Sequence, residues 1–148
     1  VELKSCISTA KNILYLGDNA GEIVFDRLFI EIIMHNHVTY AVRGKAILND
    51  VTMDDALSVG MDKVADIISN GAGNPSTVLD DCSDEFVQAF NNADLIISKG
   101  QGNLEGLIDL NDSRIFFLLM AKCDVIAERL CVDKGSFNVV KGAEIKQS

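Results

Sequence analysis

Residues 13–26, ILYLGDNAGEIVFD, join a short apolar run to an amphipathic run through a turn that carries an acid and an amide. Residues 13–16 predict a buried strand, and residues 22–34 place apolar side chains at helical spacing. Glycine suits the turn between them because it tolerates unusual backbone angles. Asp18 and Asn19 have two interpretations: they cap the following helix, as favoured N-cap residue types, or they belong to a binding site.

The same alternation of strand-like and helix-like segments continues along the chain. Apolar runs typical of strands occupy residues 38–42, 64–69, 94–98, 114–120 and 136–140. Helical patterns occupy residues 52–59, a segment that begins at Ser83, and residues 124–130. Strands that alternate with helices pair in parallel through right-handed crossovers. The pattern therefore predicts an α/β/α sandwich with a mainly parallel sheet of at least five strands.

Composition and charge narrow the class of protein. We expect residues 1–148 to form a single α/β domain, with a polar tail at residues 143–148. A net charge of −9 argues against a nucleic-acid partner, which requires a basic face. The sequence shows neither an apolar run long enough for a transmembrane helix nor a signal peptide, so we expect no membrane partner. Four cysteines without a CxxC pair indicate reduced thiols and a cytoplasmic location.

Polar residues follow the predicted strands at the end where such folds bind ligands. In chain order, these residues are Asp18, Asn19 and Gly21; Arg43, Gly44, Lys45, Asn49 and Asp50; Ser69, Asn70 and Gly71; and Lys99, Gly100, Gln101, Gly102 and Asn103. Carboxylate and amide oxygens suit Mg²⁺ or Mn²⁺. A lysine beside a helix N-terminus suits a phosphate group.

Several of these residues also have structural interpretations. Thr52 and Asp55 have the spacing of a helix capping box, which leaves Asp50 as the freer carboxylate. Lys99 could end a strand in solvent, although the Gly-Gln-Gly-Asn sequence that follows it favours close approach of the backbone to a ligand. Glu22 is either a general acid/base or a first-turn acid that the helix dipole favours.

Three motifs carry a resemblance to a known family. LGDNAGEIVFD (residues 16–26), VRGKAILNDVTMDDA (42–56) and ADLIISKGQGNLEGL (93–107) resemble motifs of the metal-dependent damage-control phosphatases. FFLLMAKCDVIAERLCVDKG (116–135) resembles the segment that follows in archaeal and bacterial stand-alone members. The likeness runs from about residue 11 to about residue 140, nearly the whole chain.

The resemblance implies a Rossmann-like domain and a phosphatase that uses a divalent metal, Mn²⁺, Mg²⁺, Co²⁺ or Ni²⁺, to hydrolyse small phosphorylated metabolites. By position, the family's metal ligands correspond to Asp18, Asn19 and Asp50, and its phosphate-contacting lysine corresponds to Lys99, with Gly100 and Asn103 beside it. The metal would neutralise phosphoryl charge and lower the pKa of a bound water, which makes Asp18 and Asp50 catalytic through the metal.

Further substrate contacts are expected from three more residues. The backbone N–H groups around Ala20 and Gly21 could hold phosphate oxygens, and Arg43 ends the second strand. Glu22 is the remaining catalytic candidate. The chain departs from the family in two ways: we expect it to lack the helical domain that precedes this segment in full-length members, and Ser76 stands where a glycine is expected.

Two other functions fit parts of the pattern. One is a non-enzymatic signalling domain that accepts a phosphoryl group near a metal, although the third predicted strand ends in Ser69 and Asn70 rather than an aspartate. The other is an enzyme that binds a nucleotide or S-adenosylmethionine, although Gly17 and Gly21 form a poor glycine fingerprint. A dehalogenase-type phosphatase would require a second aspartate at the position of Ala20.

Overall fold

One six-stranded sheet organises the computed structural model, which describes residues 2–35 and 37–145. The strands are β1 (Ile13–Leu16), β2 (Val38–Val42), β3 (Asp66–Ser69), β4 (Leu95–Lys99), β5 (Ile115–Met120) and β6 (Phe137–Lys141). They lie in the order β3-β2-β1-β4-β5-β6; β1 to β5 are parallel, and β6 is antiparallel to β5. The prediction of a mainly parallel α/β sheet is confirmed.

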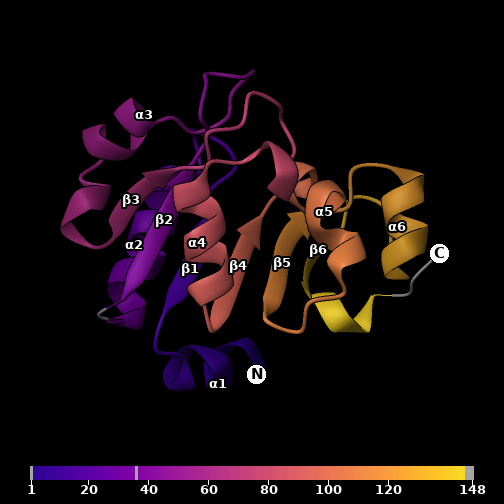
Figure 1. The fold of residues 1–148 in the computed structure, drawn as a ribbon. Coiled ribbons are helices and arrows are strands. Elements are labelled where there is room, and N and C mark those ends of the chain that lie inside the picture. The colour runs from indigo at the N-terminus through magenta and orange to yellow at the C-terminus, as the bar shows by residue number, and fades with distance from the viewer. Residues whose placement is uncertain (1, 36, 146–148) are drawn as a thin grey trace.

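Helices cover both faces of this sheet (Figure 1). They are α1 (Glu2–Thr9), α2 (Ile23–Ile33), α3 (Met53–Ser58), α4 (Asp84–Asn92), α5 (Gln101–Leu107) and α6 (Asp124–Leu130), with 3-10 turns at Met61–Lys63, Leu79–Asp81, Ile108–Leu110 and Gly142–Glu144. Side chains of α1, α2 and α3 pack on one face, and side chains of α4, α5 and α6 pack on the other. The result is the predicted three-layer sandwich.

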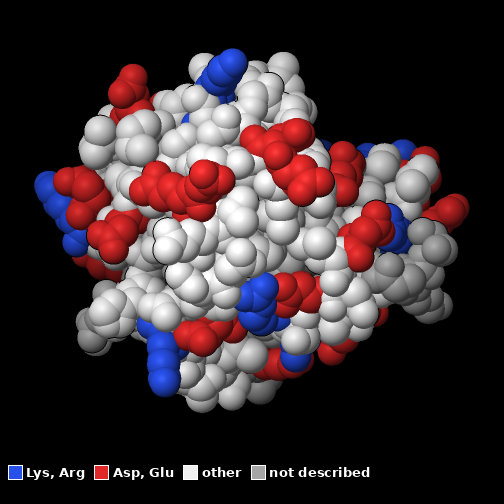
Figure 2. All heavy atoms as spheres, in the orientation of Figure 1, with Lys and Arg blue, Asp and Glu red and all other residues white. Residues whose placement is uncertain are grey.

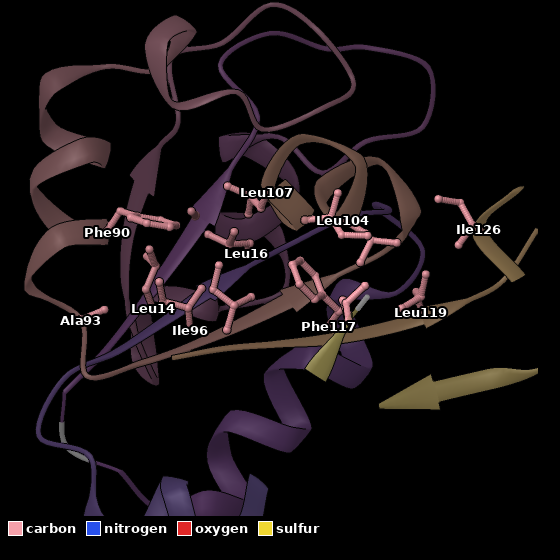
Figure 3. Packing of buried hydrophobic residues seen from close by; sticks show 14 of the residues in the cluster. Leu14, Leu16, Phe90, Ala93, Ile96, Leu104, Leu107, Phe117, Leu119 and Ile126 are labelled. Carbon is pink, nitrogen blue, oxygen red and sulfur yellow. The ribbon is translucent and has the colours of Figure 1, made fainter. Parts of the chain in front are cut away.

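Two apolar clusters explain why these segments form the layers. Successive residues of β1 point to opposite faces, so Ile13 and Tyr15 enter one cluster and Leu14 and Leu16 enter the other. Figure 3 shows the second cluster, in which Phe90 from α4 approaches Leu14. Because both faces of β1 are buried, the strand reads as a continuous apolar run.

Capping fixes two of the helix starts as the sequence predicts. Thr52 and Asp55 form a complete capping box on α3, in which the Thr52 side chain accepts from the Asp55 N–H and the Asp55 carboxylate accepts from the Thr52 N–H. Ser83 caps α4 by accepting a hydrogen bond from the N–H of Phe86.

Helix α5 is not among the helical segments that the sequence pattern predicted. Gly102 and Gly106 lower helix propensity, but both are required by packing. A Cβ at Gly102 would lie 2.5 Å from the carbonyl oxygen of Pro75, and one at Gly106 would lie 2.1 Å from that of Thr77. The glycines let the segment from Pro75 to Thr77 lie directly against α5.

The sequence pattern predicted the last strand, β6, but not its antiparallel direction, and it did not predict helix α1. Beyond β6, Ile145 is buried, while residues 146–148 of the expected polar tail lie outside the described residues.

In the described part of the chain, none of the helices has the length and apolar character needed to cross a membrane. On the face seen in Figure 2, acidic side chains are widely spread and the basic ones do not gather into a patch.

Candidate functional site

The carboxyl ends of β1, β2 and β4 meet at one edge of the sheet, at the loops seen along the top of Figure 1. Strand β1 lies between β2 and β4, with Leu16 opposite Ala41 on one side and opposite Ser98 on the other. The loop after β1 is therefore flanked by the loops that follow the other two strands. Most of the polar residues predicted to form the site lie on these three loops.

A short backbone bridge joins the loop after β1 to the loop after β2. Asn19 pairs with Asp50 in antiparallel fashion, and the N–H of Val51 donates to the carbonyl of Asp18 at 2.8 Å. These backbone contacts bring the side-chain positions of Asp18, Asn19 and Asp50 together, although the two loops are about thirty residues apart in the sequence.

Asp18 is a nearly buried carboxyl, with 8% of its surface exposed. Burial, followed by the neighbouring charges of Asp50 and Glu22, raises its pKa to about 6. The Asp18 carboxylate packs closely against the backbone of Gly100, which has φ +80° and no side chain. A Cβ at Gly100 would lie 2.1 Å from Asp18 Oδ2. The site thus crowds like charges where a cation would relieve their repulsion.

The donor chemistry fits a hard divalent cation, provided that Asn19 takes part. Among the described residues, no three His, Cys, Asp or Glu side chains gather in a metal-binding group, so Asp18 and Asp50 need an amide oxygen as a third ligand. Asn19 Nδ2 donates to Asp18 Oδ2 (2.9 Å) and Glu22 Oε1 (3.2 Å), and its Oδ1 accepts from Asn49 at 2.6 Å. To bind a cation beside Asp18, the Asn19 carboxamide must turn its oxygen toward the carboxylates.

Arg43 is buried and makes four hydrogen bonds within the fold, so the structure does not place it as the substrate contact that the sequence suggested. Its Nε donates to Asp50 at 2.8 Å, and Nη1 donates to Thr77 at 2.9 Å. Nη2 donates to the carbonyl of Pro75 (2.8 Å) and to Asn103 Oδ1 (2.9 Å). The guanidinium group instead fixes the position of the Asp50 carboxylate through its Nε hydrogen bond.

Asn103, like Arg43, is buried and hydrogen-bonded within the fold, so it is not available as a direct phosphate contact. Its Nδ2 donates to the carbonyls of Gly17 (3.1 Å) and Lys99 (2.7 Å), while its Oδ1 accepts from Arg43 and Thr77. Every polar atom of this buried side chain therefore has a partner within the fold. Asn103 ties the ends of β1 and β4 together beneath the site.

The backbone N–H groups at the start of α2 are largely used within the fold. The Ala20 N–H donates to the carbonyl of Asn49 (2.8 Å), and the Glu22 N–H donates to that of Asn19 (3.0 Å). The expectation that Ala20 offers a free donor to phosphate is therefore not met. Gly21 is exposed beside them.

Lys99 lies at the end of β4 and forms ion pairs with two acids from α2. Its Nζ is 3.0 Å from Glu22 Oε2 and 2.9 Å from Asp26 Oδ1. Burial alone would raise the pKa of Glu22, but the hydrogen bond and charge of Lys99 outweigh it and hold that pKa below its usual value. Glu22 is therefore ionised at neutral pH and can accept a proton but not supply one.

A pocket of about 540 Å³ opens beside these groups. Its charged end is formed by Asp18, Glu22, Lys99 and Lys122. Its apolar wall includes Phe25 of α2 and residues of β5 and β6, namely Leu118, Met120, Phe137 and Val139. Lys122 is exposed and forms no ion pair with any described residue.

Sequence reasoning missed Asp26, Lys122 and Thr77 as parts of this region. Asp26 follows Glu22 by four residues on a helix, a spacing that could have marked both acids as facing the same neighbour. Lys122 comes two residues after Met120, which ends β5, so the strand-end argument could have included it. Thr77 gave no comparable signal.

Comparison with known proteins connects this geometry to a family. Residues 2–136 match the damage-control phosphatase ARMT1-like domain. A damage-control phosphatase from Pyrococcus horikoshii is 46% identical over 138 residues, covering 91% of this chain and 48% of that protein. A damage-control phosphatase from Archaeoglobus fulgidus is 41% identical over 126 residues, covering 83% and 44%.

A solved structure agrees with the fold. The crystal structure of a DUF89 family protein from Pyrococcus horikoshii superposes with a TM-score of 0.92 at 44% identity, covering 95% of this chain and 50% of that one. The chain thus spans about half the length of the relatives that it matches.

Proposed function

Because this chain belongs to the damage-control phosphatase ARMT1-like family, we propose that it hydrolyses phosphate monoesters of small metabolites, such as sugar or cofactor phosphates, with a divalent metal. The family supports phosphatase activity in general. The observation that carries the finer proposal is that the loops after β1 and β2 bring Asp18 and Asp50 together, while Asp18 and Lys99 line one pocket.

The balance of charge around the pocket favours metal dependence. Among the described residues, Asp18, Glu22, Lys99 and Lys122 line the pocket. Behind them, Asp26 pairs with Lys99 and Asp50 pairs with Arg43, so four carboxylates lie in this region with three cations. This excess of negative charge would repel a phosphate dianion. A divalent cation would reverse the sign of the local charge and so allow the dianion to bind.

Asp18, Asp50 and the amide oxygen of Asn19 would hold this cation, which could be Mn²⁺, Mg²⁺, Co²⁺ or Ni²⁺. When bound, such a cation supplies charge neutralisation at the phosphoryl oxygens and a more acidic water. The chain's own residues supply the rest: Arg43 fixes Asp50, and Gly100 leaves room for Asp18.

Two lysines would bind the phosphoryl oxygens. Lys99 donates two hydrogen bonds to acids and has three donors, so one remains for a ligand. Lys122 lines the same pocket with its charge uncompensated by any ion pair to a described residue. Glu22, ionised and beside Lys99, can accept a proton from the attacking water.

We also propose a cytoplasmic location. Each of the four cysteines, Cys6, Cys82, Cys123 and Cys131, is free, as expected in a reducing compartment.

A phosphate-release screen tests the function. Sugar phosphates and cofactor phosphates are incubated with the chain and each of the four metals, with EDTA as the matched control and the Pyrococcus horikoshii relative as reference. The proposal expects release that requires a metal. Absence of release with all four metals, or release that EDTA leaves unchanged, would overturn it, and a stable acyl phosphate on Asp18 would favour the signalling alternative.

A further inference from the structure

Asp26 is a buried carboxylate that the proposed chemistry does not use. It lies on α2 with 2% of its surface exposed, and it is not among the residues that line the pocket. Three donors from three different strands converge on it: Tyr15 Oη of β1 at 2.7 Å, Tyr40 Oη of β2 at 3.0 Å and Lys99 Nζ of β4 at 2.9 Å. Burying a carboxylate costs free energy, and these three donors offset that cost.

The two tyrosines hold this carboxylate rigidly. Their rings stack with centroids 5.4 Å apart, and both are buried in the same apolar cluster. Burial, and then the charge of Asp26, raise the pKa of both hydroxyls, so each remains a protonated donor. Tyr15 donates to Oδ1 and Tyr40 donates to Oδ2, which fixes the orientation of the carboxyl group.

Lys99 connects this buried group to the pocket. Its side chain keeps 18% of its surface exposed and lines the charged end of the pocket, while Asp26 holds it from the buried side and Glu22 from the exposed side. A free lysine side chain loses rotamer entropy when it binds an anion. A fixed anion behind the ammonium group removes part of that loss before the ligand arrives.

We propose that Asp26, oriented by Tyr15 and Tyr40, is a positioning residue that holds the Lys99 ammonium group at the pocket for a substrate phosphate. The inference rests on the proposed function and deepens it. Glu22 is the exchangeable partner of Lys99, since it is half exposed, whereas Asp26 is the permanent one. Asp26 acts through Lys99 and does not touch the substrate.

A double-mutant cycle separates positioning from a general structural role. The affinity for inorganic phosphate, in the presence of Mn²⁺, is measured by calorimetry for the unchanged chain, Asp26→Asn, Lys99→Met and the double variant. We expect the affinity for inorganic phosphate to be about 10-fold weaker in Asp26→Asn and 10- to 100-fold weaker in Lys99→Met. The double variant should bind phosphate no more weakly than Lys99→Met alone, because Asp26 has no other route to the ligand.

Two controls accompany the cycle. Asp112→Asn removes another ion-paired carboxylate, one held by Arg114 away from the pocket, and should leave phosphate affinity unchanged. Tyr40→Phe keeps the ring and removes one donor to Asp26, so it replaces Asp26→Asn if that variant does not fold. It should weaken phosphate binding about 3-fold in the unchanged chain and not at all in Lys99→Met.

The outcomes distinguish this inference from the proposed function. Additive losses in the double variant, an unchanged affinity in Asp26→Asn, or absence of phosphate binding by the unchanged chain would overturn the positioning role. Phosphate binding with the expected non-additive cycle, but without metal-dependent phosphate release, would support positioning and contradict the proposed function.

Discussion

Arg43 Nε and a carboxylate oxygen of Asp50 lie 2.8 Å apart in a pair whose side chains are 2% and 9% exposed. The pair joins the end of β2 to the loop that follows it, at the point where that loop bridges to Asn19. Because further donors of Arg43 reach Thr77, Pro75 and Asn103, one guanidinium group fixes the position of Asp50 relative to two other segments of the chain.

Arg43→Gln should be strongly destabilising. Breaking a buried ion pair leaves an uncompensated carboxylate, and we expect a loss of about 3–5 kcal/mol in the free energy of unfolding, measured by urea denaturation. Arg27→Gln is the matched control, because the pair between Arg27 and Glu31 is a more exposed i,i+4 pair that should contribute less than about 0.5 kcal/mol. Equal losses in the two variants would show that the Arg43 network has no special structural role.

Gly100→Ala should weaken Mn²⁺ binding in addition to lowering stability through backbone strain. Gly100 and Gly135 both have positive φ, +80° and +85°, so an alanine at either position should cost roughly 1–3 kcal/mol of stability. Only at Gly100 would the new Cβ meet Asp18, at 2.1 Å, whereas nothing lies within 4 Å at Gly135. We expect Gly100→Ala to lower Mn²⁺ affinity and Gly135→Ala to preserve it. Identical Mn²⁺ affinities would separate Gly100 from the metal site.

Asp18→Asn should stabilise the metal-free chain in a pH-dependent way. The folded pKa of about 6 lies above the usual value of an aspartate, so the folded chain binds the proton more tightly and stability falls as pH rises from about 4 through 6. We expect no gain from Asp18→Asn near pH 4 and a gain of up to about 3 kcal/mol at pH 7.5. Thermal unfolding in EDTA at both pH values measures this, with Asp80→Asn, at an exposed acid, as control. A gain that is the same at both pH values would contradict the electrostatic explanation.

Lys122→Ala should weaken the binding of inorganic phosphate about 10-fold without changing Mn²⁺ affinity, since one charge-assisted contact is removed. Lys134→Ala is the control: Lys134 is exposed, pairs with Asp124 and does not line the pocket. Calorimetry with phosphate and metal titrated separately distinguishes the two effects. If both lysine variants bind phosphate like the unchanged chain, Lys122 has no part in the site.

Much of the fold could be predicted because its elements depend on local pattern. Strand β1 is buried on both faces and short, so its apolar run marks it clearly, and the capping box of Thr52 and Asp55 fixes the start of α3. Helix α5 could not be predicted, because its glycines have low helix propensity and are explained only by contact with Pro75 and Thr77.

The candidate site divides in the same way. The strand-end rule identified the neighbourhood of Asp18, Asp50 and Lys99, because parallel strands deliver their carboxyl ends to one edge. It could not tell which polar side chains face the pocket. Arg43 and Asn103 are residue types that often contact ligands, yet both are buried and form hydrogen bonds within the fold. Asp26 reads as an ordinary helix acid, and only the tertiary fold brings Lys99 to it across 73 positions of sequence.

The most direct test of the account compares the Mn²⁺ affinity of Asp50→Asn with that of Asp55→Asn by calorimetry. Asp50 lies beside Asp18 and Asn19, whereas Asp55 is engaged in the capping box. We expect Asp50→Asn, compared under conditions in which it is folded because it also breaks the buried pair with Arg43, to lose more than the roughly 10- to 100-fold typical of indirect effects on metal sites. Asp55→Asn should keep its metal affinity and lose only about 1 kcal/mol of stability. If Asp55→Asn loses Mn²⁺ binding and Asp50→Asn retains it, the assigned metal site is wrong.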